Sequence, residues 1–172
     1  MALIIQDDTG TVAGANSYNT IAEFKAYHDA RGGDYSGSTD DQINAAIIRA
    51  TDYVDARFYY VGFKQNSRAQ TTQWPRINAF DCANYAVSGV PDEIKAAVNE
   101  YAFRALSTTL NPDQTQDGTG RAYNSKSETV GPISVSTAYE SGSGATMPRY
   151  PAADQKIIKA CLVCQGSTLV RA

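Results

Sequence analysis

The strongest constraint on the fold is an apolar stripe in residues 43–61. Its members are spaced by 4, 3, 4, 4 and 3 residues: Ile43, Ile47, Ala50, Val54, Phe58 and Val61. At about 100° per residue these side chains fall within an arc of about 80° on a helix. The stretch therefore predicts a helix with one buried face, and a fold that supplies apolar surface to cover it.

Local start and stop signals predict three more helices. Thr20 and Glu23 form a capping box before a helix from about residue 21 to 31, and Thr39 with Gln42 forms a second box before the striped helix. Pro91 opens a third helix that ends before Asn111. It is apolar on two faces and therefore needs two neighbours. A last helix is predicted from Pro151 to Gly166.

Residues 111–150 are rich in Gly, Ser, Thr, Asn and Gln and predict a polar excursion. Within it, Ile133, Val135, Thr137 and Tyr139 alternate as in a strand, and residues 130–132 can turn a hairpin. A two-stranded ribbon alone is marginal in water, so Ile133 and Val135 are expected to lie against another copy or a partner.

The predicted fold class is mainly α. We expect a small bundle of about four helices, with a long loop and a β-hairpin between the third and last helices. Residues 1–172 are expected to form a single domain. Residues 111–150 would be its excursion, and residues 151–172 its C-terminal helix and tail.

The net charge of −3 is unevenly distributed along the chain. Residues 1–60 hold four Lys or Arg against nine Asp or Glu, whereas residues 122–172 hold five against three. A dedicated nucleic-acid binder should show a basic face, because neutralising phosphates supplies most of its affinity. The overall charge argues against that class.

Three cysteines, an odd number, favour reduced thiols over a disulfide framework. No stretch is apolar for the roughly 18 to 20 residues that a membrane span needs, and the N-terminal residues do not resemble a signal peptide. We therefore expect a soluble, cytosolic protein without contact to membranes.

No residue pattern indicates catalysis, a metal site or a cofactor. His28 is the single histidine and lies on a helix face, where a structural role is more common. Cys161 and Cys164 lie inside an apolar helical run without a second ligand pair. Asp52 and Asp55 fall on the predicted solvated side of the striped helix. The prediction is a protein that is not an enzyme.

The sequence Trp74-Pro75-Arg76 contains the only tryptophan. Pro75 favours an extended conformation for the preceding residue, which would let the Trp74 indole pack on the helices as a buried anchor. Arg76 is then expected to reach a carboxylate, on an adjoining subunit if one is present. Trp74 as an interface residue is the alternative.

Several stretches together resemble tailed-phage head-to-tail connector, or neck adaptor, proteins. Some members of that family are labelled DnaT-like single-stranded-DNA-binding proteins. The similarity runs over nearly the whole chain, through residues 15–32, 47–58, 73–76, 90–106, 127–135 and 149–158.

This resemblance implies a structural virion protein, assembled in the host cytoplasm and placed in the phage neck. The subunits would form a ring, usually twelve-fold, that binds the portal protein and the next neck or tail component, a stopper or tail terminator. Double-stranded DNA would pass through the ring without sequence-specific binding. The basic residues expected to dock on the portal are Arg149, Lys156, Lys159 and Arg171.

Two alternatives remain open. One is a head-completion or tail-terminator protein of the same neck. The other is a single-stranded-DNA-binding module of the DnaT-like kind, in which stacking and cationic groups would come from Trp74, Tyr53, Tyr59, Tyr60 and Arg57.

Overall fold

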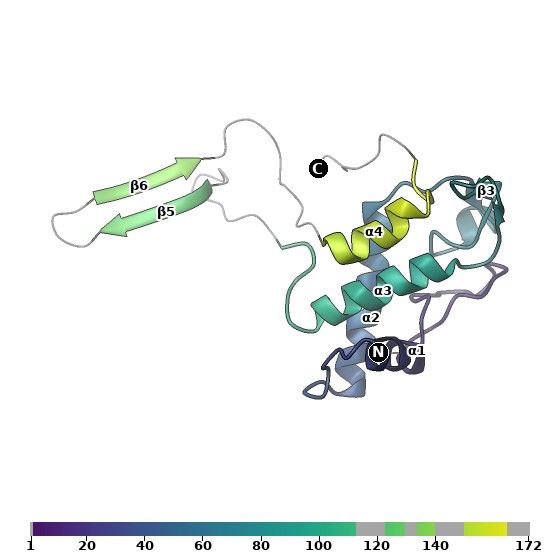
Figure 1. The fold of residues 1–172 in the computed structure, drawn as a ribbon, viewed down its shortest axis with the longest axis horizontal. Coiled ribbons are helices and arrows are strands. Elements are labelled where there is room, and N and C mark those ends of the chain that lie inside the picture. Colours follow the sequence, from purple (N-terminus) through teal and green to yellow (C-terminus); the bar gives the residue numbers. More distant parts are fainter. Residues whose placement is uncertain (1, 113–122, 130–133, 140–149, 165–172) are drawn as a thin grey trace. The chain divides into compact units, whose positions relative to one another are not determined.

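The computed structural model describes residues 2–112, 123–129, 134–139 and 150–164. It is mainly helical, with four α-helices and small two-stranded antiparallel sheets, which confirms the predicted fold class (Figure 1). The helices are α1 (Ile21–Asp29), α2 (Asp40–Arg57), α3 (Asp92–Ala105) and α4 (Pro151–Lys159). The strands are β1 (Phe63–Lys64), β2 (Arg76–Ile77), β3 (Ala79–Phe80), β4 (Ala86–Val87), β5 (Tyr123–Thr129) and β6 (Ser134–Tyr139), with a short 3-10 helix, η1 (Ser67–Ala69).

Both predicted capping boxes are present at the helix starts. The Glu23 amide donates to Thr20 Oγ1 at 3.1 Å, and the Thr20 amide donates back to Glu23 Oε2 at 2.7 Å. Thr39 and Gln42 make the same reciprocal pair before α2. These side chains satisfy amides that a helix start leaves without partners, so local sequence alone sets the start of both helices.

The core lies between α2, α3 and α4. Five members of the predicted stripe on α2 are buried, and only Val61, beyond the end of the helix, is partly exposed. Helix α3 packs against both α2 and α4 (Figure 1), and on another side Phe103 stacks on His28 with 4.7 Å between the ring centroids. The prediction that α3 needs more than one neighbour is confirmed.

Helix α4 is shorter than predicted. It ends at Lys159, and Cys161 follows in the left-handed region with φ of 56°. Cys161 forms a disulfide with Cys82, and Cys164 is a free thiol. The expectation of three reduced thiols, two of them inside a helix, is therefore wrong. A bridge across 79 residues requires tertiary contact that no local pattern reports.

The hairpin predicted in the polar excursion is present as β5 and β6, which pair antiparallel from Tyr123 with Tyr139 to Thr129 with Ser134. Val135 lies in β6 opposite Glu128. Ile133 and the predicted turn at residues 130–132 lie outside the described residues.

The chain divides into two compact units, residues 1–110 with 149–170, and residues 111–148 with 171–172. The assignment of all 172 residues to one domain stays a prediction. None of the helices in the described part of the chain combines the length and apolar character needed to cross a membrane.

Candidate nucleic-acid interface

Trp74 is a buried anchor, as predicted. Its side chain is 0% exposed, and its ring meets the Tyr60 ring edge-on with 5.7 Å between centroids. Its backbone amide donates to the Tyr18 hydroxyl at 3.0 Å, and its carbonyl accepts from Thr72 Oγ1 at 2.8 Å. The following peptide bond, to Pro75, is cis. A side chain held in this way is not available to stack on a base.

Among the described residues, Arg76 donates to backbone carbonyls and to Gln73 rather than to a carboxylate, and its expected contact with a carboxylate of an adjoining subunit stays a prediction. Its guanidinium donates to the carbonyl oxygens of Val61 and Gly62, both at 2.7 Å. Weaker bonds go to the Tyr60 carbonyl at 3.3 Å and to Gln73 Oε1 at 3.1 Å. Arg76 therefore holds the two ends of residues 60–76 together, and its guanidinium hydrogens are used within its own chain.

Asp52 and Asp55 occupy different environments, although both were expected to be solvated. Asp52 is exposed, whereas Asp55 accepts hydrogen bonds from the Tyr18 hydroxyl at 2.7 Å and the Gln73 amide at 2.8 Å. Burial raises the pKa of the Asp55 carboxyl to about 6. Asp55 thus ties α2 to the segment that holds Trp74.

Arg57 lies in a buried polar cluster between helices. Its guanidinium forms an ion pair with Asp154 of α4 at 2.9 Å, and both side chains are nearly buried. The Tyr101 hydroxyl of α3 donates to the same carboxylate. The role of Arg57 is to hold α2, α3 and α4 together, since a buried charge without its partner is costly.

We call residues 58–91 the ribbon segment. Four aromatic side chains are exposed in it. Their exposed fractions are 56% for Tyr59, 68% for Phe63, 46% for Phe80 and 72% for Tyr85. Large apolar side chains turned to water are typical of interaction surfaces when they gather in one patch, which makes this stretch the candidate interface. Of the five groups that sequence reasoning assigned to single-strand binding, only Tyr59 is exposed; Phe63, Phe80 and Tyr85 were missed.

Two small sheets position these aromatic side chains. Phe63 of β1 lies opposite Ile77 of β2, which is also exposed, and Phe80 of β3 lies opposite Ala86 of β4. The tight β1–β2 approach requires glycine at position 62, where φ is 73° and a Cβ would lie 2.4 Å from the Ile77 carbonyl oxygen. A strand of two residues is too short to show the alternation of apolar and polar residues by which strands are predicted. The sequence therefore did not reveal this surface.

The ribbon segment is basic although the whole chain is acidic. It holds Lys64, Arg68 and Arg76 against one acid, Asp81. Arg68 is exposed and makes no hydrogen bond or ion pair within the described residues, and the Lys64 ammonium donates to the Gln70 carbonyl at 3.0 Å. Arg68 can therefore meet a phosphate, and Lys64, which is half-buried, can do so through the ammonium hydrogens that Gln70 does not accept. The net charge of −3 describes the whole chain and conceals the positive charge of this segment.

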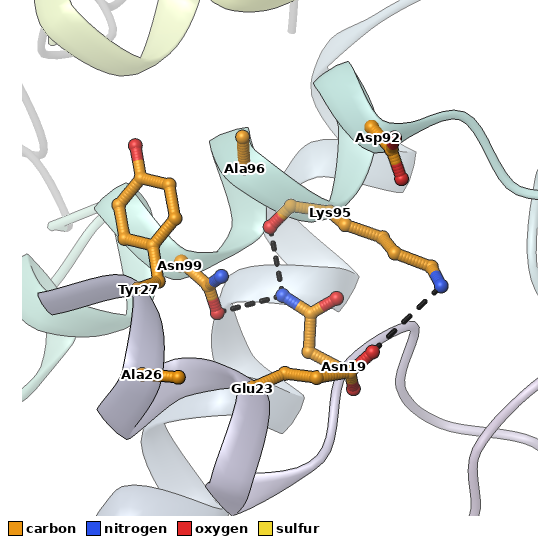
Figure 2. A pocket seen from close by; sticks show the side chains of 8 residues that line it. All are labelled: Asn19, Glu23, Ala26, Tyr27, Asp92, Lys95, Ala96 and Asn99. Carbon is orange, nitrogen blue, oxygen red and sulfur yellow. Dashed lines mark hydrogen bonds and ion pairs between the residues drawn. The ribbon is translucent and has the colours of Figure 1, made fainter. Parts of the chain in front are cut away.

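A separate hollow of about 420 Å³ lies where α1 and α3 begin (Figure 2). The Asn19 amide nitrogen donates at 2.7 Å to both the Lys95 carbonyl and Asn99 Oδ1, and Asn19 Oδ1 is left buried without a partner among the described residues. Glu23 and Asp92 line the hollow with one cation, Lys95. Two carboxylates against one ammonium disfavour phosphate here, so the hollow is not a backbone site for nucleic acid.

The structure offers no catalytic or metal constellation in the residues it describes. His28 is buried, its Nε2 lies 3.0 Å from the Asn99 carbonyl oxygen, and burial lowers the pKa of its imidazole. No three His, Cys, Asp or Glu side chains in this part of the chain are grouped to hold a metal ion.

Two of the proposed portal-docking residues lie in the last turn of α4, and two fall outside the described part. Lys156 is half-buried on α4 and Lys159 is exposed at its end. Arg149 and Arg171 lie outside the described residues, as does Ile133.

Comparison with known proteins corrects the sequence-based identification. No curated protein and no solved structure matches the chain. The model of one family matches residues 1–172, and its description is "Putative DnaT-like ssDNA binding protein". The identification as a phage neck adaptor is therefore wrong, and with it the twelve-fold ring, the portal and tail partners, the DNA channel and the place in the virion. Over its full length the chain belongs to the family of DnaT-like ssDNA-binding proteins.

Proposed function

We propose that the chain binds single-stranded DNA through the ribbon segment and catalyses no reaction. The observation that carries the proposal is the coincidence of exposed aromatic rings with local positive charge in residues 58–91. Membership of a family described by single-strand binding supports the same conclusion.

Single-stranded DNA suits this surface better than a duplex. Unpaired bases expose their faces, and stacking one base on an aromatic side chain is worth about 1 to 3 kcal/mol. Bases in a duplex are already stacked on one another, so a duplex would meet only the cations. With Lys64 and Arg68 as the accessible cations of the segment, stacking must supply much of the affinity.

Tyr85 and Phe63 are the best-placed stacking groups because they are the most exposed. Tyr85 is also well oriented: its backbone amide donates to Asp81 Oδ1 at 2.9 Å, and the Asp81 amide donates to the Tyr85 carbonyl at 3.0 Å. A ring on an ordered backbone loses little conformational entropy when a base stacks on it.

Fluorescence anisotropy with a labelled oligothymidine and a duplex of equal length tests the proposal. We expect binding of the single strand, with at most weak binding of the duplex, and a shallow salt slope of about −1 to −2 for two or three neutralised phosphates. The double variant Phe63→Ala/Tyr85→Ala, which removes the two most exposed rings, should lose most of the affinity. Ile4→Ala, an exposed apolar residue outside the segment, is the matched control. Equal affinity of the double variant and the control for oligothymidine would refute the proposed surface.

A further inference from the structure

The proposed function does not use the Cys82–Cys161 disulfide. Cys82 lies in the turn between β3 and β4, and Cys161 lies just after α4, with 5.2 Å between their Cα atoms. The bond therefore joins the turn between Phe80 and Tyr85 to the C-terminal end of α4; β3 and that end of α4 lie on the same side of the unit (Figure 1).

The β3–β4 ribbon is anchored in the core at Ala79, but residues 80–87 are exposed or half-buried. Its hydrogen bonds run within itself: Asp81 Oδ1 accepts from the amides of Ala83 and Tyr85, and the Asn84 amide donates to the Asp81 carbonyl. Among the described residues, the one polar contact from residues 80–87 to another element is Cys82 Sγ, 3.4 Å from the Lys159 carbonyl oxygen. A two-stranded ribbon is not stable by itself.

The segment after α4 is secured differently. The Val61 amide donates to the Leu162 carbonyl at 3.1 Å, and the Cys164 amide donates to the Tyr59 carbonyl at 2.8 Å. Leu162 is buried. Opening the disulfide is therefore expected to loosen residues 80–87, whereas these backbone hydrogen bonds keep residues 162–164 and Tyr59 in place.

We propose that the Cys82–Cys161 disulfide is a redox-sensitive clamp on the DNA-binding surface, holding Phe80 and Tyr85 in place at the end of α4 that bears Lys159. The clamp regulates the site proposed above and rests on that proposed function. With the disulfide formed, two stacking rings and the exposed ammonium of Lys159 belong to one ordered surface. With it open, binding a strand must also order residues 80–87, and this entropic cost lowers the affinity.

The reductant is a dithiol. One of its thiolates attacks the Sγ of Cys82, whose residue is exposed, and the Cys82–Cys161 bond breaks as a mixed disulfide forms. Cys161 leaves as a thiolate and takes a proton. The second thiol of the reductant then displaces Cys82, so two electrons enter the protein and the dithiol leaves as a cyclic disulfide.

Oligothymidine affinity measured before and after dithiothreitol tests the clamp. We expect reduction to weaken binding by about 5- to 10-fold, less than the loss of two stacking contacts. Cys82→Ser and Cys161→Ser should bind like the reduced protein and not respond to dithiothreitol. Cys164→Ser, which leaves the disulfide intact, is the matched control and should respond like the wild type.

Amide hydrogen exchange shows whether the disulfide orders only residues 80–87 or the whole helical unit. Reduction should speed exchange in residues 80–87 and leave α2, α3 and residues 162–164 unchanged. Wild-type affinity in Cys82→Ser, or loss of helical circular dichroism in the reduced protein, would overturn the clamp. If the oxidised protein does not bind oligothymidine at all, the proposed function itself is wrong.

Discussion

The helical core and the ribbon segment use aromatic side chains in opposite ways. In the core, Tyr18, Phe24 and Tyr101 are buried, and the tyrosine hydroxyls find carboxylates at Asp55 and Asp154. In the ribbon segment, Phe63, Phe80 and Tyr85 face water. The ribbon segment itself contains both kinds of aromatic residue, because Trp74 belongs to the core. Eleven tyrosines in the sequence therefore say little about binding until burial separates them.

Trp74→Ala should give the largest effect, because it creates a cavity in the core. We expect a loss of about 3 to 5 kcal/mol in the free energy of unfolding, measured with urea. Phe80→Ala, which truncates an aromatic ring on the other side of the boundary, should change this free energy by less than about 1 kcal/mol. Similar losses in the two variants would remove the distinction between core and surface.

Asp55→Asn should change how stability depends on pH. Burial raises the folded-state pKa of the Asp55 carboxyl to about 6, above the ordinary value of about 3.9 for an aspartate, so the folded protein favours the neutral acid. This contribution to stability is complete below pH 4 and is lost as the pH rises from about 4 to 6, by up to about 3 kcal/mol.

Chemical unfolding of both proteins between pH 4 and 7 checks this sign. The wild type should lose stability relative to Asp55→Asn as the pH rises. A constant difference between wild type and Asp55→Asn would mean that Asp55 is solvated.

Tyr85→Ala should weaken oligothymidine binding by about 1 to 3 kcal/mol, roughly 5- to 150-fold, with the free energy of unfolding nearly unchanged. Anisotropy and urea unfolding on the same preparation measure both quantities. A loss of stability as large as that of Trp74→Ala would place Tyr85 in the core instead.

Arg68→Ala should have the smallest effect, because it removes one phosphate contact and no stacking. The slope of log affinity against log salt should become shallower by about 0.7. Arg31→Ala provides the arginine control outside the ribbon segment, since Arg31 is exposed and donates to the Tyr27 carbonyl. Equal slopes for the wild type and Arg68→Ala would exclude Arg68 from the surface.

The sequence by itself determined the elements whose signals are local. Thr20 and Thr39 each meet their capping partner three residues later, and the stripe on α2 depends only on helical periodicity, so both could be predicted. The alternation that predicted β5 and β6 is equally local. The burial of Trp74 was predicted from its neighbour Pro75, which favours an extended conformation and lets the indole pack on the helices.

Only the tertiary structure decided which groups are free to act. The Asp55 carboxylate is shielded from water because Tyr18 and Gln73 approach it from distant parts of the chain, and Arg76 is occupied because the backbone turns carbonyls toward it. Cys82 meets Cys161 across 79 residues. Exposure and pairing depend on contacts between residues far apart in sequence, and neither composition nor net charge reports such contacts.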